Sequence, residues 1–230
     1  MRRALRDNGL SLSFLAIFAL ALAGQAVAGH AAYNEEEVAL AEALGDRPET
    51  ISLGRYVLSS SFGQAVLENW QSEYLQFTLY LTATVWLIQR GSPESKKPGT
   101  EGRESEKAQR LGPYADERSP AWARASGVRR RLYANSLFIA MGLLWAGSWL
   151  GQSVTGWRAF NAERLQLGEA TLAWAEYLRS ATFWESTLQN WQSEFLAIGS
   201  MAVFSVYLRQ RGSPESKPVG APHEQTGVTG

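Results

Sequence analysis

Residues 10–28 read LSLSFLAIFALALAGQAVA, a run of 19 positions without a charged side chain. A helix that crosses the ~30 Å hydrocarbon core of a bilayer needs about 20 predominantly apolar residues. A second run of similar length, SLFIAMGLLWAGSWLGQSV, occupies residues 136–154. Both runs lack the polar face that a helix on the surface of a soluble protein needs. We therefore predict that each of them spans a membrane.

Two shorter apolar blocks occupy residues 74–88 and 195–208. They reach the spanning length only if the preceding residues 70–73 and 191–194 continue the helix into the headgroup zone, where Trp side chains are frequent. With that extension, the sequence predicts an all-α polytopic membrane protein with four transmembrane helices. Four buried helices of a soluble protein are the alternative.

Long words of sequence occur twice. Asn-Trp-Gln-Ser-Glu at 69–73 recurs at 190–194, and QRGSPESK at 89–96 recurs at 210–217, both 121 positions later. Across the 41 aligned positions around these words, 20 residues are identical. Such self-similarity marks a duplicated structural unit. Because each copy crosses the membrane twice, both copies start from the same side, and we predict two tandem parallel helix–connector–helix repeats.

The domain boundaries follow from these blocks and from the Gly-, Pro- and charge-rich segments between them. We predict a first repeat at 1–96 with spans of about 10–28 and 70–89, a charged cytoplasmic linker at 97–130, a second repeat at 131–217 with spans of about 136–154 and 191–209, and a disordered cytoplasmic tail at 218–230.

The two external connectors are expected to hold short amphipathic helices. Residues 56–67 and 174–188 carry apolar side chains at helical spacing. Asn34 and Asn161 are each followed by acidic residues within three positions. An Asn before acidic residues is typical of a helix start, so both positions are predicted helix N-caps.

The first 29 residues also have the form of a secretory signal. Arg2, Arg3 and Arg6 precede the apolar run, and Ala26-Val27-Ala28 fits a cleavage site. Their counterpart in the second copy is internal and cannot be a signal. We therefore predict a retained membrane helix, with cleavage as the alternative.

The net charge of zero divides unequally along the chain. The head, the segment 89–135 and the tail hold 17 of the 22 basic residues and nine acids, a balance of +8. The two connectors, with Glu73 and Glu194, hold five bases and 13 acids, a balance of −8. Basic residues accumulate on the cytoplasmic side of membrane proteins. The sequence thus predicts a multi-pass inner-membrane protein with both termini in the cytoplasm.

Composition excludes several kinds of function. A zero net charge argues against a nucleic-acid partner. The chain has no Cys, and its two His, His30 and His223, are far apart in the sequence. No phosphate-binding loop, HExxH or GxSxG motif is present. We predict no catalytic residue, no metal site and no cofactor, and hence no enzyme.

Polar side chains near the outer ends of the predicted spans form the first candidate site. A polar layer around the repeat axis would comprise Gln25, Asn69, Glu73, Gln152, Asn190 and Glu194. Three interpretations stay open: a layer that fixes helix register through hydrogen bonds, a site for a solute or ion, and solvated contacts with lipid headgroups.

The second candidate is the repeated QRGSPESK word. Its role is predicted to be a helix stop and cytoplasmic anchor, in which the arginines lie in the last helical turn and the glycines are left-handed. Docking of a cytoplasmic partner is the sharper alternative. The residues concerned are Arg90, Gly91, Pro93, Arg211, Gly212 and Pro214.

These repeated words resemble a family of uncharacterised bacterial membrane proteins, catalogued as domain of unknown function 6766. The resemblance implies a bacterial inner-membrane protein and transfers no catalytic or binding residue. We expect a non-enzymatic membrane protein that acts by interaction or as a structural component. Its expected partners are the lipid bilayer and a second copy of the chain or a cytoplasmic protein. The alternative is a small oligomeric transporter or channel with Glu73 and Glu194 at its outer mouth, and an enzyme comes third.

Overall fold

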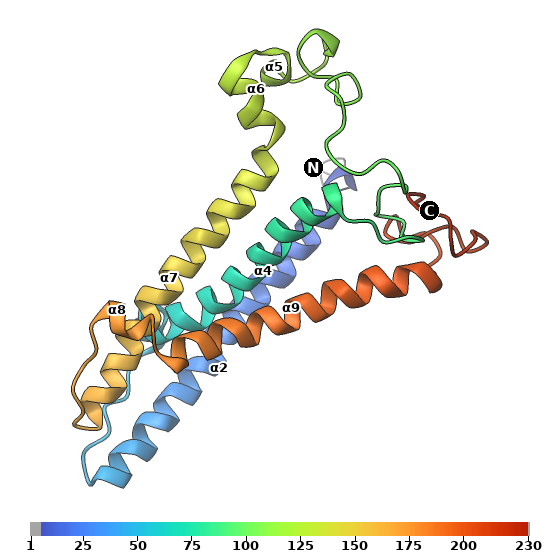
Figure 1. The fold of residues 1–230 in the computed structure, drawn as a ribbon. Helices are drawn as coiled ribbons and strands as arrows, with labels where there is room; N and C mark the ends of the chain where they lie inside the picture. Colours follow the sequence, from blue (N-terminus) through green and yellow to red (C-terminus); the bar gives the residue numbers. More distant parts are fainter. Residues whose placement is uncertain (1–5, 230) are drawn as a thin grey trace. The chain divides into compact units, whose positions relative to one another are not determined.

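A computed structural model describes residues 6–229, which form helices and turns and contain no strand. The all-α class is therefore confirmed. The predicted basic positions Arg2 and Arg3, and Gly230 at the end of the tail, lie outside the described residues. The helices, in chain order, are α2 (Gly9–Leu44), α3 (Leu53–Val57), α4 (Ser60–Trp86), the 3₁₀ turn η1 (Gly112–Tyr114), α5 (Ala121–Arg124), α6 (Gly127–Ala134), α7 (Ser136–Gln166), α8 (Trp174–Tyr177) and α9 (Ala181–Tyr207) (Figure 1).

The chain divides into two compact units. One unit contains Met1–Val66 and Gly151–Trp174, and the other contains Leu67–Leu150 and Ala175–Gly230. Helices α4 and α7 each begin in one unit and end in the other. The contacts described below lie within one unit or the other.

Two of the described helices are long and apolar enough to cross a membrane. These are α2, with 36 residues, and α7, with 31. None of the most apolar stretch of α2 is buried, and Leu10 and Leu20 are each 75% exposed. Exposing apolar surface to water costs about 25 cal/mol per Å², so an environment other than water suits this helix better.

The other two predicted spans lie in α4 and α9, which have 27 residues each. Both helices continue without a break through the repeated Asn-Trp-Gln-Ser-Glu word, as the predicted extension requires. Their Gln, Glu, Ser and Thr side chains make them less apolar than α2 and α7, and they fall short of the same membrane-spanning criterion. Two of the four predicted spans thus meet it.

The predicted helix starts at Asn34 and Asn161 are wrong. Both residues lie inside long helices, α2 and α7, which continue through Gly29 and Gly156 five residues earlier. The Asn34 side chain instead hydrogen-bonds both backbone groups of Ile51, donating to its oxygen at 3.0 Å and accepting from its nitrogen at 2.9 Å. Asn161 does the same with Leu172, at 2.9 and 2.8 Å. Each Asn therefore fastens the returning connector to its own helix.

This fastening is the same although the connectors differ in length. The paired residues are 17 positions apart in the first case and 11 in the second. The six extra residues of the first connector extend the loop without altering the contact that closes it.

The connector helices α3 and α8 are shorter than predicted, with five and four residues. The rest of the predicted amphipathic segments already belongs to α4 and α9. Each short helix has, at or next to its last residue, a buried tyrosine that packs against a phenylalanine six positions later. The ring centroids of Tyr56 and Phe62 are 5.4 Å apart, and those of Tyr177 and Phe183 are 5.6 Å apart. These pairs form the local cores of the two connectors.

Candidate functional site

The two Asn-Trp-Gln-Ser-Glu words lie on α4 and α9, within the same unit, and hydrogen bonds join the two helices there. The bonds run from the Asn190 side-chain amide to the Glu68 carboxylate at 2.9 Å, from the Trp191 indole N–H to the Gln71 side-chain oxygen at 2.8 Å, and from the Gln76 side-chain amide to the Glu194 backbone oxygen at 2.9 Å. The positions of the partners rise together along both helices. Helices α4 and α9 therefore run in the same direction.

The Gln71–Trp191 bond is the most enclosed of the three. Gln71 is fully buried, and its side-chain amide also donates to the backbone oxygen of Glu68. A buried amide or indole N–H without a partner costs about 1–3 kcal/mol. Each partner satisfies the other here, so the pair fixes one register of α4 against α9.

The six residues of the predicted polar layer are divided between the units. Gln25 and Gln152 belong to the first unit, and the other four to the second. In the second unit, the Asn190 side chain and the Glu194 backbone bond to α4, whereas Asn69 and Glu73 are exposed on that helix. The carboxylates of Glu73 and Glu194 are close enough to repel each other electrostatically. The layer as a whole stays a prediction.

Sequence reasoning did not single out Glu68 or Gln71, and it interpreted Trp191 only as an interfacial side chain. Gln71 and Trp191 carried a usable signal, since both belong to the duplicated word. Glu68 carried none, because its counterpart 121 positions later is Gln189.

An aromatic cluster adjoins these bonds. The ring centroid of Trp149, on α7, is 6.3 Å from that of Trp191, 6.1 Å from that of Trp184 and 6.2 Å from that of Phe183. Trp145 stacks on Trp149 one helical turn earlier, at 5.8 Å. Aromatic pairs at such distances contribute about 0.5–1.5 kcal/mol each beyond their buried area. The cluster ties the first half of α7 to α9.

The two QRGSPESK words fold into the same turn. In the first copy, the Ser92 N–H donates to the Gln89 oxygen (3.0 Å), the Gln89 N–H to the Ser95 hydroxyl (3.0 Å) and the Glu94 N–H to the Ser92 hydroxyl (3.3 Å). The second copy has the same three bonds, from Ser213 to Gln210 (3.2 Å), from Gln210 to Ser216 (3.0 Å) and from Glu215 to Ser213 (3.2 Å). The third position of this turn is glycine, with φ of 89° at Gly91 and 83° at Gly212. A turn with a positive φ at its third position favours glycine.

The helices end before this turn and not within it. Helix α4 ends at Trp86 and α9 at Tyr207. Arg90 and Arg211 therefore lie beyond the last helical turn. The sequence predicts them within that turn, so this part of the prediction is wrong. The turn's own serine hydroxyls accept the backbone N–H groups there, so the chain leaves the helix without continuing its hydrogen-bond pattern. The role of these turns as cytoplasmic anchors stays a prediction.

The two turns meet through equivalent glutamates. The Glu215 carboxyl hydrogen-bonds the Glu94 carboxyl, and this bond, together with the negative charge of Glu94, raises the pKa of Glu215 above its ordinary value. The Tyr80 hydroxyl donates to the same Glu94 carboxylate at 2.5 Å. A proton shared between two carboxylates is held more tightly than on either alone.

We expect Glu215→Gln to stabilise the protein at pH 7–8 by about 0.5 kcal/mol and to have little effect at pH 4. A carboxyl group with a raised pKa contributes its stability below its unfolded pKa and loses it as the pH rises through the raised value. The amide keeps a donor to Glu94 and carries no charge at any pH. The side chain is exposed, so solvent screening keeps the effect small. Thermal unfolding in detergent at both pH values measures it. Glu117→Gln, on the exposed linker, serves as the control and should change neither value; equal shifts for both variants would contradict the prediction.

The C-terminal segment lies against the first of these turns. The Gly91 N–H donates to the Thr226 hydroxyl at 2.8 Å, and the Gly227 N–H donates to the Ser92 oxygen at 3.0 Å. The disorder expected for the tail stays a prediction, and in the structure residues 218–229 form a series of turns.

The Lys217 ammonium group holds these turns together through hydrogen bonds. It is only 1% exposed and donates to the backbone oxygens of Pro222, His223 and Gln225 at 3.2, 2.8 and 3.2 Å. Burial lowers the pKa of Lys217. The tail carbonyls replace the water that this charge would otherwise require.

Among residues 6–229 there is no group of three or more His, Cys, Asp or Glu that could hold a metal ion.

Comparison with known proteins gives one match. No curated protein and no solved structure matches the chain. The model of one protein family, described as Domain of unknown function (DUF6766), matches residues 1–228. The chain therefore belongs to the DUF6766 family.

Proposed function

We propose that this chain is a multi-pass bacterial inner-membrane protein without enzymatic activity, and that it acts as a structural or interaction component of the membrane. Helices α2, α4, α7 and α9 would span the bilayer as two tandem parallel repeats. Both termini and the linker between the repeats would face the cytoplasm.

Three observations support this topology. Helices α2 and α7 have the length and apolarity of membrane spans. Helices α4 and α9 run in the same direction, as parallel repeats require. The uneven division of charge agrees with basic residues on the cytoplasmic side. An uninterrupted α2 beyond Ala28 also favours retention of the first span over its removal as a signal.

The single observation that carries the structural role is the use of the repeated words. Their buried polar groups bond to the neighbouring helix, as Gln71 does with Trp191. Interhelical hydrogen bonds of this kind fix the packing of membrane helices and contribute about 0.6–2 kcal/mol each. A second copy of the chain or a cytoplasmic protein would be the partner of the assembled helices.

A transporter or channel is the second candidate, and one observation favours it. Glu73 is exposed, and its carboxylate repels that of Glu194 electrostatically. These two like charges lie at the middle of α4 and α9. Like negative charges close together attract cations. Four spans are few for a transporter, so this role would require oligomerisation.

Two sets of variants separate these candidates in liposomes. The structural role predicts that Glu73→Gln with Glu194→Gln leaves pH-dependent ion flux unchanged. It also predicts that Gln71→Leu lowers stability by about 2 kcal/mol, because it removes the acceptor of the Trp191 N–H. Gln192→Leu is the matched control, since Gln192 is the exposed counterpart of Gln71 in the second copy. Loss of flux in the double Glu variant would instead assign the residues to transport.

A further inference from the structure

An open cavity of about 1140 Å³ lies against the linker between the repeats. Its walls include Val85 near the end of α4, residues of the linker, α6, and Ser136 at the start of α7. The cavity therefore lies where one apolar helix begins and where the hydrogen-bonded helix α4 ends. In the proposed topology this is the cytoplasmic face of the membrane.

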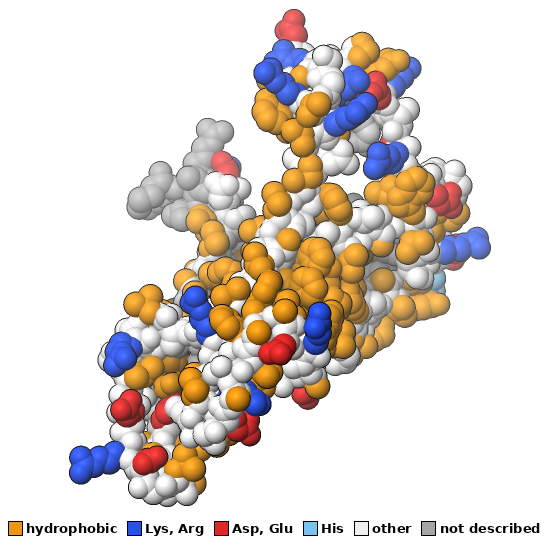
Figure 2. Space-filling model, turned by 60° about the vertical axis from the view of Figure 1, so that its left-hand side comes forward, with side chains coloured by type: hydrophobic (Ala, Val, Ile, Leu, Met, Phe, Trp, Pro, Cys, Tyr) orange, Lys and Arg blue, Asp and Glu red, His pale blue; other side chains and the backbone are white. Residues whose placement is uncertain are grey.

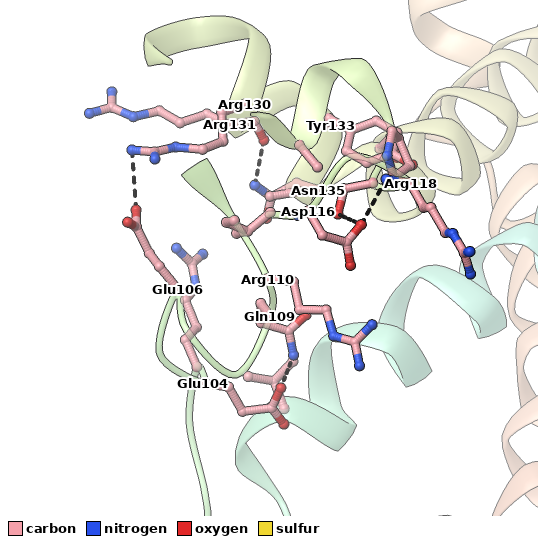
Figure 3. A pocket seen from close by; sticks show the side chains of 18 of the residues that line it. Glu104, Glu106, Gln109, Arg110, Asp116, Arg118, Arg130, Arg131, Tyr133 and Asn135 are labelled. Atoms are coloured by element: carbon pink, nitrogen blue, oxygen red, sulfur yellow. Dashed lines mark hydrogen bonds and ion pairs between the residues drawn. The ribbon is translucent and has the colours of Figure 1, made fainter. Parts of the chain in front are cut away.

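The cavity carries an excess of positive charge. Its charged lining residues are six bases, Lys96, Arg103, Arg110, Arg118, Arg130 and Arg131, and three acids, Glu104, Glu106 and Asp116. The acids are already engaged. Glu104 pairs with Lys96 at 3.0 Å and Glu106 with Arg130 at 3.2 Å. Asp116 accepts the backbone N–H of Arg118 at 2.8 Å (Figure 3).

Four guanidinium groups remain for a ligand. Within residues 6–229, no ion pair joins Arg103, Arg110, Arg118 or Arg131 to a carboxylate. Guanidinium groups bind phosphate through paired N–H donors, which makes arginine the preferred side chain for this anion.

Arg110 has an unusual backbone conformation. Its φ is 51°, the only positive φ at a described residue other than glycine. The Leu111 N–H bonds the Glu106 oxygen at 2.9 Å and the Arg110 N–H bonds the Lys107 oxygen at 3.2 Å, the pattern of a chain reversal in which glycine is usual at this position. An arginine here accepts backbone strain and places its side chain on the cavity wall (Figure 3).

Apolar side chains adjoin the arginines. Val128, Leu132 and Tyr133 on α6 are 68%, 45% and 38% exposed. Figure 2 shows Lys and Arg side chains beside hydrophobic ones over the region of α5 and α6, at the top of the view. Basic residues next to exposed apolar ones at the end of a membrane helix match the headgroup and the upper acyl chains of an anionic lipid.

We propose that this cavity binds the phosphate group of an anionic phospholipid of the inner leaflet, through Arg103, Arg110, Arg118 and Arg131. The lipid source of the phosphate rests on the proposed function. Phosphate binding itself does not, because it is measured in detergent, where topology plays no part.

The test uses the purified full-length protein in nonionic micelles doped with phosphatidylglycerol or with phosphatidylcholine. We expect saturable binding of phosphatidylglycerol that weakens with salt, and none of phosphatidylcholine. Replacing all four arginines by Gln should abolish this binding, since each basic contact with an anionic lipid contributes about fivefold. The matched control replaces Arg47, Arg55, Arg158 and Arg179, which remove the same charge from the two connectors. Equal loss in the control, or no loss in the first variant, would overturn the proposal.

Two further arms complete the test. Arg110→Gly relieves the backbone strain, so it should unfold at the same or a higher temperature and still bind phosphatidylglycerol about fivefold more weakly. Unchanged binding would overturn the role of Arg110. Glycerol 3-phosphate and inorganic phosphate are titrated as soluble competitors. Displacement of the lipid at equal concentrations would assign the cavity to a soluble phosphate compound and overturn the lipid source.

Discussion

Phe183→Ala is expected to destabilise the protein by about 3–5 kcal/mol. Phe183 is 2% exposed and lies at the centre of the aromatic cluster. Its ring centroid is 5.6 Å from that of Tyr177, 5.6 Å from that of Trp184 and 6.2 Å from that of Trp149. Truncation leaves a cavity that these large, rigid rings cannot close. Thermal unfolding in detergent, followed by tryptophan fluorescence, measures the loss.

The matched control for this substitution is Phe204→Ala on the same helix. Phe204 is 56% exposed, so its truncation removes little buried surface, and we expect a change below about 1 kcal/mol. The expected difference between the two variants is about 5–15 °C in melting temperature, at 2–4 °C per kcal/mol for a chain of this size. Equal effects of the two truncations would show that Phe183 is not part of a packed core.

Gly91→Ala is expected to lower the free energy of unfolding by about 3–5 kcal/mol, whereas Gly212→Ala should lower it by only about 1–2 kcal/mol. Both glycines occupy the third position of the same turn, with φ of 89° and 83°, so alanine is strained at both. At Gly91 an added Cβ would also collide with the His223 backbone oxygen and lie 2.8 Å from a Val206 methyl group. At Gly212 no atom lies within 4 Å of the added carbon.

This pair of substitutions isolates the contact between the C-terminal segment and the first turn. The strain is common to both variants, and only the steric collision differs. Deletion of residues 218–230 should therefore reduce the effect of Gly91→Ala and leave that of Gly212→Ala unchanged. If Gly212→Ala proved as costly as Gly91→Ala, the collision with His223 and Val206 would play no part.

The sequence predicted the helical class and the main helices, because long apolar runs and repeated words are strong local signals. The left-handed glycines of the QRGSPESK turn were also predictable, since Gly before Ser-Pro is a recognisable helix stop. The word contains no signal for the exact last helical residue. Arg90 and Arg211 consequently lie outside the helices, although the sequence predicts both in the last helical turn.

Side-chain partners far apart in the sequence were not predictable. An Asn before acidic residues resembles an N-cap, and only the fold shows that Asn34 and Asn161 bond to connectors that return 17 and 11 residues later. The bond between Gln71 and Trp191 depends on the relative position of two helices 120 residues apart. The cavity in the linker depends on turns that composition alone describes as flexible.

Site-directed labelling distinguishes the four-span topology from other arrangements of the chain in the membrane. The chain has no cysteine, so a single introduced Cys is the only thiol present. Variants Glu49→Cys and Gly168→Cys probe the two connectors, and Ser119→Cys probes the linker. With a membrane-impermeant maleimide on intact spheroplasts, we expect labelling at 49 and 168, and labelling at 119 only after the membrane is disrupted. Labelling at 119 on intact spheroplasts, or opposite results for 49 and 168, would contradict the four-span topology.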